Sequence, residues 1–279
     1  MVDLSFTSGW RRLLRSMALI RATSVELAVL AGHLLLYPTG VFQELSTEQD
    51  TAARGSSGGA LAERRISAAP CGSPPVLLLH GFVDNRSVFA LLARSLRRNG
   101  WQCVQSLNYS PLTCDVRDAA ALLGQHVERA CEQSGHQRVD IVGHSLGGLI
   151  ARYYVQRLGG DVRVRTLITL GTPHSGTRAI PFANPHPLIR QMRPNSELLR
   201  ELAKPAIGCS TRFVAFWSDL DEFMVPAETA RLDHPDLAVR NVEVPGIGHL
   251  TFPVNSAVAA AIRQTLADEE EFGGAVDAA

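Results

Sequence analysis

A glycine-rich stretch in the middle of the chain constrains the fold more than any other feature. Residues 143–148 read Gly-His-Ser-Leu-Gly-Gly. The apolar run 139–142 before them predicts a buried strand, and the apolar pattern 149–158 after them predicts a helix. A strand that passes directly into a helix leaves little room between the two, and glycines two positions before and after the serine remove the side chains that would clash. The stretch therefore predicts a sharp turn with Ser145 at its apex.

This arrangement has a chemical consequence for Ser145. A Gly-x-Ser-x-Gly pattern between a strand and a helix is typical of a nucleophile elbow. The turn exposes the serine hydroxyl beside a helix N-terminus, where the dipole and the N–H groups favour developing negative charge. Glycines around a serine also occur in ordinary turns, but the flanking strand and helix favour the catalytic interpretation. We therefore predict that Ser145 is a nucleophile.

From about residue 74 onward the chain alternates between apolar strands and helices. Such alternation predicts an α/β fold with a mostly parallel sheet and helices on both faces. Asp115 is expected to cap the helix that follows it. Strands are expected at 76–80, 101–107, 138–142, 162–170, 212–217 and 237–244, and helices at 87–98, 115–133, 149–158 and 251–266.

The N-terminal segment 1–45 is a separate piece in which arginines precede an apolar run at 25–37. Glu26 and His33 interrupt this run and no cleavage site is obvious, which argues against a signal peptide. The run is also short for a membrane span. Two interpretations stay open: a helix that lies on a membrane surface, or a helical arm packed on the catalytic domain. A transmembrane anchor is less favoured than either.

The remaining boundaries follow from composition. Residues 46–73 are rich in Ser, Gly and Ala and predict a flexible linker. The catalytic domain is expected at 74–266, followed by an acidic flexible tail at 267–279. The 279 residues carry a formal net charge of zero at pH 7, which argues against nucleic-acid binding.

The five cysteines show no C-x-x-C spacing, so a metal site is not expected. A disulfide stays open, but we interpret most cysteines as small buried hydrophobes in a reducing compartment. A cytoplasmic or membrane-associated location is accordingly favoured over secretion. The cysteines are Cys71, Cys103, Cys114, Cys131 and Cys209.

A second candidate group of catalytic residues lies at the end of the first strand of the domain, where residues 80–82 read His-Gly-Phe. Acyl transfer needs two N–H donors aimed at the oxygen of a tetrahedral intermediate. The amide of Leu146, directly after the nucleophile, is one candidate. The amide of Phe82 is the other, because Gly81 lets the chain approach closely. His80 is expected to support this loop rather than to catalyse.

A serine hydroxyl needs an imidazole to accept its proton and a carboxylate to orient the imidazole. With a nucleophile elbow, these groups follow in the order serine, acid, histidine. His249 lies in a glycine-containing loop between the last strand and the last helix, which makes it the predicted base. The acid is expected after the strand 212–217. Asp221 is the predicted acid, because the apolar residues 223–226 that follow it can shield the pair from water, and Asp219 is the alternative.

The stretch 174–205 lacks the apolar pattern of a strand. It holds several prolines and a short helical pattern that Ser196 is placed to cap, with Leu198, Leu199 and Leu202 on one face. We interpret the stretch as a lid or a wall of an acyl pocket. An insertion packed permanently on the sheet is the alternative, and both stay open.

Taken together, these segments resemble α/β-hydrolases of the bacterial lipase and esterase kind, similar to triacylglycerol lipases. The chain is also similar to deacylases that act on lipid-anchored substrates. The resemblance spans 74–266 and implies an α/β-hydrolase fold with a lid or cap insertion and no cofactor. Some lipases carry structural calcium, but no carboxylate cluster dedicated to it is visible. The matching segments are 80–82, 143–148, 169–177, 218–226 and 246–249, of which 169–177 is the most specific.

We therefore expect a serine ester hydrolase that cleaves acyl esters of apolar or lipid substrates. Ser145 attacks, His249 transfers the proton, Asp221 orients His249, and the amides of Phe82 and Leu146 bind the oxyanion. A thioesterase or acyltransferase with the same residues is an alternative. A non-catalytic module that binds a lipid or a partner is less favoured, because every catalytic role has a candidate. The expected partners are a small-molecule or lipid ester and a membrane surface contacted by the N-terminal segment.

Overall fold

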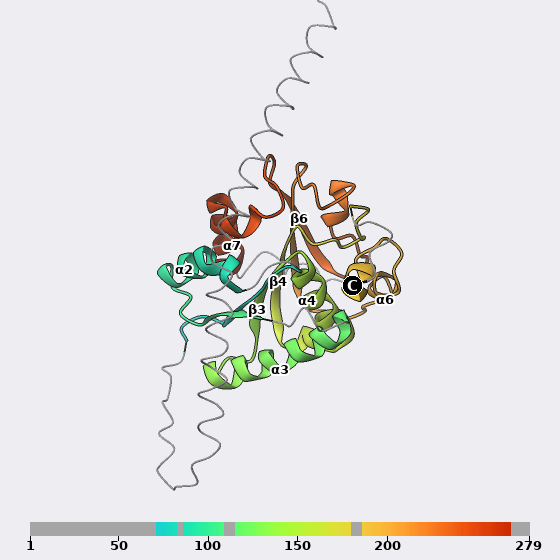
Figure 1. Ribbon diagram of the computed structural model, residues 1–279. Helices are drawn as coiled ribbons and strands as arrows, with labels where there is room; N and C mark the ends of the chain where they lie inside the picture. Colours follow the sequence, from blue (N-terminus) through green and yellow to red (C-terminus); the bar gives the residue numbers. More distant parts are fainter. Residues whose placement is uncertain (1–70, 83–85, 109–114, 180–185, 269–279) are drawn as a thin grey trace, which may run out of the picture.

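The computed structural model describes residues 71–82, 86–108, 115–179 and 186–268 (Figure 1). The N-terminal segment and nearly all of the expected linker and of the acidic tail lie outside these residues. Membrane association through the N-terminal segment and the predicted domain boundaries therefore stay predictions. Among the described residues, no helix combines the length and the apolar character that a membrane span needs.

The described residues form one sheet of six parallel strands. Its spatial order is β2-β1-β3-β4-β5-β6. Strands β1 and β3 are buried along their whole length, as expected for a parallel sheet that is covered on both faces. The strands are β1 (Val76–Leu79), β2 (Val104–Leu107), β3 (Val139–His144), β4 (Val164–Leu170), β5 (Arg212–Trp217) and β6 (Ala238–Glu243).

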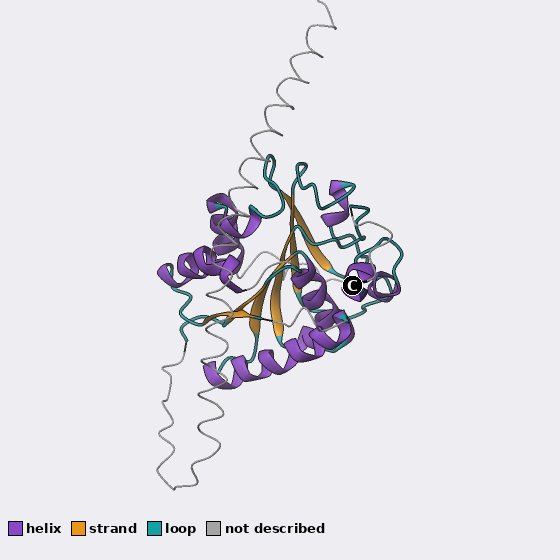
Figure 2. Cartoon of the chain, in the orientation of Figure 1, coloured by secondary structure: helices purple, strands orange, loops and turns teal. Residues whose placement is uncertain are grey.

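Helices cover both faces of this sheet (Figures 1 and 2). Helices α2 (Ala90–Arg98) and α7 (Ser256–Ala267) pack on one face, and α3 (Val116–Ser134) and α4 (Leu146–Arg157) pack on the other. The predicted arrangement of a parallel sheet with helices on both faces is confirmed. Shorter elements are η1 (Arg86–Phe89), η2 (Gly160–Val162), α5 (Pro187–Gln191), α6 (Glu197–Leu202), η3 (Ala227–Ala230) and η4 (Phe252–Val254).

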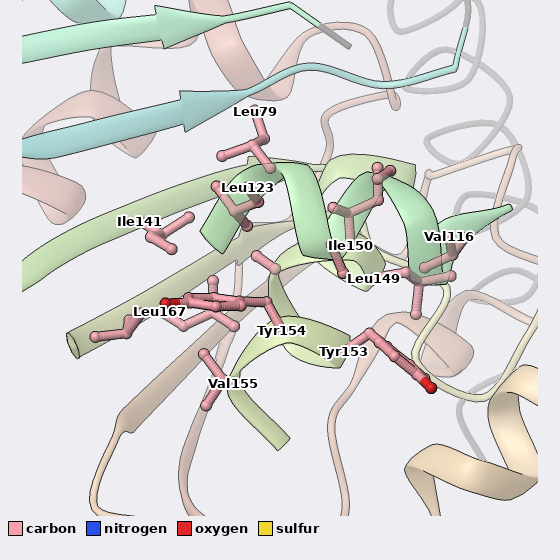
Figure 3. Close-up of a cluster of buried hydrophobic side chains, with 14 of the residues drawn as sticks. Leu79, Val116, Leu123, Ile141, Leu149, Ile150, Tyr153, Tyr154, Val155 and Leu167 are labelled. Atoms are coloured by element: carbon pink, nitrogen blue, oxygen red, sulfur yellow. The ribbon is translucent and has the colours of Figure 1, made fainter. Parts of the chain in front are cut away.

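The two-residue period of the strands divides the core into two layers. In β1, Leu77 and Leu79 join the cluster around α3 and α4, whereas Val76 and Leu78 join the cluster around α2 and α7. Figure 3 shows the first cluster, in which side chains of α3 and α4 meet those of the sheet. Each fully buried Leu or Ile there stabilises the fold by about 1.5 to 3 kcal/mol relative to an exposed one.

Local signals placed two helix starts, whereas α2 begins at Ala90 rather than at 87 and α7 at Ser256 rather than at 251, each after a short 3-10 turn. The Asp115 carboxylate accepts a hydrogen bond of 2.8 Å from the backbone N–H of Arg117, and the Ser196 hydroxyl accepts one of 3.3 Å from Leu199. Both predicted caps are confirmed. Helix α4 differs from the expectation, because it begins at Leu146 rather than at 149. The turn between β3 and α4 consumes only the serine itself.

The insertion after β4 is tied to the helices beside it. Glu201 of α6 accepts hydrogen bonds from both Arg117 (2.6 Å) and the Tyr153 hydroxyl (2.9 Å). Arg152, only 3% exposed, donates to the carbonyl oxygen of Leu202. Burial lowers the pKa of this guanidinium to about 9. These contacts favour the alternative of a packed insertion, although they are made to α3 and α4 rather than to the sheet, and the lid or acyl-pocket wall stays a prediction.

The structure corrects the interpretation of two cysteines. Cys71 and Cys103 form a disulfide, with 6.2 Å between their Cα atoms. The bond joins the residues before β1 to the start of the edge strand β2, where the Val76 N–H also donates to the Cys103 carbonyl. Cys131 is free and buried, as expected, and Cys209 is free and half-buried. The pairing was not resolved by the sequence because it depends on the alignment of β1 with β2.

Removing this disulfide should destabilise the domain. The two cysteines are 32 residues apart, and closing a loop of this size in the unfolded chain is worth about 3 to 4 kcal/mol. We expect the Cys71→Ala/Cys103→Ala variant to have a lower melting temperature that reductant does not change. Wild type and the Cys209→Ala control should both melt lower in reductant. Equal melting of the wild type with and without reductant would contradict the assignment.

Candidate active site

Ser145 stands at the end of β3 in a strained backbone conformation. Its φ of 51° and ψ of −119° lie in a region that residues with a side chain rarely adopt. Hydrogen bonds from neighbouring segments hold the Ser145 backbone in this conformation. The Ser145 N–H donates to the carbonyl of Leu170 (2.9 Å), and the Ser145 carbonyl accepts from the Thr172 hydroxyl (3.0 Å). The predicted sharp turn is therefore braced by the end of β4 and the loop that follows.

Two glycines allow this turn to form. A Cβ atom at Gly147 would lie 2.5 Å from the carbonyl oxygen of Leu79 and 2.6 Å from that of His80. A Cβ atom at Gly143 would lie 2.7 Å from the backbone of Gly148. No side chain fits at either position. The first turn of α4 consequently lies against the end of β1, which brings the loop at 80–82 beside the nucleophile.

The predicted oxyanion residues lie in this loop and at the start of α4. Phe82 lines the same pocket as Ser145, and Leu146 is the buried first residue of α4. His80 donates through Nδ1 to the Gly81 carbonyl at 2.7 Å, so it supports the loop as expected. Both residues therefore lie at the nucleophile, and the assignment of their backbone N–H groups as oxyanion donors stays a prediction.

Asp221 and His249 form a buried pair. His249 Nδ1 donates to Asp221 Oδ2 at 2.9 Å, and the side chains are 5% and 0% exposed respectively. The other carboxylate oxygen, Oδ1, accepts from the backbone N–H groups of Phe223 (3.0 Å) and Met224 (3.2 Å). With the proton on Nδ1, the imidazole presents Nε2 as its proton-accepting atom. His249 and Ser145 line the same pocket.

Two aromatic rings hold the His249 imidazole. The Phe223 ring stacks on it with 4.8 Å between centroids, and the His144 ring lies 4.7 Å away. His144 also donates through Nε2 to the His249 carbonyl oxygen at 3.1 Å. In the sequence, His144 had no role beyond its place in the glycine-rich stretch. Its contact with His249 could not be predicted there, because the two residues are 105 positions apart.

Asp219, the alternative acid, has a different place. It is exposed, and its carboxylate accepts from the backbone N–H of Gly246 at 3.0 Å. The neighbouring Ser218 hydroxyl donates to the carbonyl of Ile247 at 2.7 Å. Both residues therefore brace the loop that carries His249, and the structure brings Asp221 rather than Asp219 to the imidazole.

The segment 169–177 contributes residues that the sequence analysis quoted without assigning a role. Gly171 has a φ of +52°, and a Cβ atom there would lie 2.8 Å from Asp221 Oδ2 and 3.1 Å from His249 Nδ1. Thr172 braces Ser145 as described above. His174 is buried against Arg152, and desolvation together with that guanidinium holds the pKa of the imidazole well below its usual value. The motif pointed to the segment, but only the fold shows what each residue touches.

A pocket of about 240 Å³ opens beside these groups. Apart from the serine, one threonine and the two histidines, its lining is apolar. Among the described residues, no cluster of His, Cys, Asp and Glu has the arrangement that a metal ion needs. The lining residues are Gly81, Phe82, His144, Ser145, Thr177, Ile189, Met192, Phe223, Met224, His249 and Leu250.

Placing a methyl group at Gly171 should disturb the Asp221–His249 pair. We expect Gly171→Ala to lower the rate at which a fluorophosphonate labels Ser145 by about 10²-fold, because a displacement of about 1 Å at a reacting group has that effect. Gly135→Ala is the matched control. Gly135 also has a positive φ, +75°, but a Cβ there meets nothing within 4 Å. Labelling of Gly171→Ala as fast as that of Gly135→Ala would contradict this expectation.

Comparison with known proteins identifies the fold and the family. Solved structures with the same fold include the lin2722 product of Listeria innocua, with 18% identity, a TM-score of 0.56 and coverage of 72% of this chain and 96% of that one. The mature lipase BlEst2 of Bacillus licheniformis has 16% identity, a TM-score of 0.60 and coverage of 70% and 92%. The monoacylglycerol lipase of Paleococcus ferrophilus has 15% identity, a TM-score of 0.53 and coverage of 70% and 95%.

These likenesses establish the α/β-hydrolase fold that the sequence predicted. The family follows from a longer match, because residues 75–220 match the palmitoyl protein thioesterase family and make up more than half of the chain. The match contains the nucleophile elbow and the loop at 80–82. It ends one residue before Asp221. The chain is a hydrolase by fold, and it belongs to the palmitoyl protein thioesterase family.

Proposed function

We propose that this protein is a serine hydrolase that cleaves acyl esters of apolar or lipid substrates through an acyl-enzyme on Ser145. The observation that carries the proposal is the buried hydrogen bond between Asp221 and His249 in the apolar pocket that also holds Ser145. An imidazole oriented by a carboxylate is the group that a serine hydroxyl needs to become nucleophilic.

In the proposed reaction, His249 Nε2 accepts the proton of Ser145 Oγ while Oγ attacks the ester carbonyl. The Asp221 carboxylate stabilises the resulting imidazolium. The amides of Phe82 and Leu146 bind the oxyanion of the tetrahedral intermediate. Collapse of the intermediate breaks the bond to the alcohol, which takes the proton from His249. Water then attacks the acyl-enzyme with His249 as its base. Collapse of the second tetrahedral intermediate breaks the bond to Ser145 Oγ, which takes the proton back from His249 as the carboxylic acid leaves.

The lining of the pocket supports an apolar acyl group. No described residue that lines it is an Asp, Glu, Lys or Arg, so a charged acyl chain would lose its hydration without a partner. Met192 comes from the insertion and Met224 from the loop that carries the acid. Methionine side chains adapt their shape, which suits a flexible alkyl chain.

Removing the nucleophile or the base should abolish turnover. We expect Ser145→Ala and His249→Ala each to lower kcat for 4-nitrophenyl esters on the order of 10³-fold or more with the fold intact. Ser145→Ala should also abolish labelling by a fluorophosphonate. Turnover by folded Ser145→Ala near the wild-type rate would refute the mechanism. A folded wild type that neither labels nor turns over would favour the non-catalytic alternative.

Asp221→Asn and Asp219→Asn distinguish the acid from its neighbour. Asp221→Asn should lower kcat on the order of 10³- to 10⁴-fold, because an amide holds the imidazole in the wrong tautomer. Asp219→Asn should cost less than about tenfold, since it weakens one exposed hydrogen bond to Gly246. Steady-state kinetics of the two variants make the comparison, and a larger loss in Asp219→Asn would reverse the assignment.

The family match favours a second candidate, hydrolysis of acyl thioesters. The same Ser145 chemistry serves both, and only the leaving group differs. A palmitoyl ester and a palmitoyl thioester with otherwise matched structures separate the two. A higher kcat/KM for the thioester would assign a thioesterase, and the reverse would assign a carboxylesterase. Formation of a new ester when an alcohol is added would assign acyl transfer.

A further inference from the structure

A buried threonine outside the proposed catalytic residues lies where three parts of the site meet. Thr177 is 3% exposed and belongs to the segment 169–177 that follows β4. It lines the pocket beside Ser145 and His249. We propose that Thr177 is a positioning residue, whose hydroxyl holds the loop that carries Asp221 in place against His249. The inference deepens the proposed function and rests on it.

The hydroxyl of Thr177 makes every hydrogen bond that a hydroxyl can make. It donates to the carbonyl oxygen of Phe223 at 2.6 Å. It accepts from the backbone N–H groups of Val225 and Ala179, each at 3.1 Å. A hydroxyl has one donor and two acceptor positions, so all three are used. Two of the three partners belong to the loop directly after Asp221.

One of these partners also touches the Asp221–His249 pair. Phe223, whose carbonyl binds the Thr177 hydroxyl, donates its backbone N–H to Asp221 Oδ1 at 3.0 Å. Its ring stacks on the His249 imidazole. A shift of this residue would therefore move the carboxylate and the imidazole together. Thr177 touches neither group in these interactions and acts on them through Phe223.

Burial alone does not hold this loop. Phe223 and Val225 are 45% and 41% exposed, whereas Met224 between them is 3% exposed, so packing fixes the middle of the loop more than these two neighbours. Their backbone is attached by the Thr177 hydroxyl and by the N–H of Arg178, which donates to the Val225 carbonyl at 3.0 Å. Loss of the hydroxyl would leave the Phe223 carbonyl and the Val225 N–H without these bonds.

Thr177 is itself fixed on the opposite side. Its N–H donates to the carbonyl of Met192 in the pocket wall at 2.9 Å. The preceding Gly176 has a φ of +83°, and a Cβ atom there would lie 2.5 Å from the backbone nitrogen of Pro194. The threonine is therefore anchored to the insertion and can serve as a rigid support for the acid loop.

The consequence for His249 has a defined sign. A carboxylate at hydrogen-bond distance favours the charged imidazolium and so raises the pKa of an imidazole. If Asp221 moves away, the pKa of His249 falls. A merely structural threonine would lower stability and leave this pKa unchanged.

The test compares Thr177→Val, Thr177→Ser and the control Thr211→Val. Thr211 is also buried, and its hydroxyl donates to the Val164 carbonyl at 2.8 Å at the far end of β5. The readouts are the His249 pKa by NMR titration of the labelled imidazole, kcat for a 4-nitrophenyl ester, and the melting temperature. We expect Thr177→Val to lower kcat at least tenfold and to lower the His249 pKa. Thr177→Ser should restore both, and Thr211→Val should change only the melting temperature.

An unchanged kcat and His249 pKa in Thr177→Val, with a melting temperature lowered as in Thr211→Val, would overturn the inference. If Thr177→Val does not fold, Thr177→Cys replaces it, because a thiol is a weaker donor and acceptor of similar size. A folded Cys variant with wild-type kcat and His249 pKa would overturn the inference equally. If the wild type hydrolyses no ester, the proposed function fails, and the NMR titration alone decides whether Thr177 positions the pair.

Discussion

The close approach of three backbone segments around Ser145 is the constraint on which the site depends. Gly147 lets the first turn of α4 lie against the carbonyls that end β1, and Gly148 lies where a Cβ atom would be 1.9 Å from the Thr172 hydroxyl oxygen. That hydroxyl in turn holds the Ser145 carbonyl. The strained conformation of the serine persists because its neighbours leave no room to relax. The same contacts set the nucleophile beside the loop that holds Phe82.

The base and the acid depend on a different kind of support. Asp221 and His249 come from loops that follow adjacent strands, β5 and β6, at the carboxyl edge of the sheet. Each loop buries an apolar residue, Met224 or Leu250, and hydrogen bonds hold the rest of its backbone. Ser218 and Asp219 bind the loop of His249, and Thr177 binds the loop of Asp221. The carboxylate stays buried because three donors satisfy it. The strands bring Asp221 and His249 to the same edge of the sheet, and hydrogen bonds between loops fix the geometry of the pair.

Much of this arrangement could be read from local sequence. The caps at Asp115 and Ser196 were identified because a short side chain before an apolar helical pattern has one common use. β5 was placed at 212–217, where the structure has it, since its apolar run ends in polar turn residues. Ser145 and His249 were predicted from their positions after strands in an alternating pattern. The disulfide between Cys71 and Cys103 was not predicted. The two cysteines approach each other because β1 pairs with β2, and no local pattern encodes that pairing.

The amino-acid sequence determined the class of fold and the candidates for each chemical role, because periodic apolar residues dictate strands and helices and the glycines dictate the sharp turn. The sequence favoured Asp221 over Asp219 because apolar residues follow it, but only the tertiary structure shows that the Asp221 carboxylate is hydrogen-bonded to the His249 imidazole. That imidazole lies 28 residues further along the chain, and no local pattern encodes a contact over this separation. The contact of Gly171 with that pair and the three bonds of the Thr177 hydroxyl have the same origin, since each joins segments that meet only when the sheet is formed.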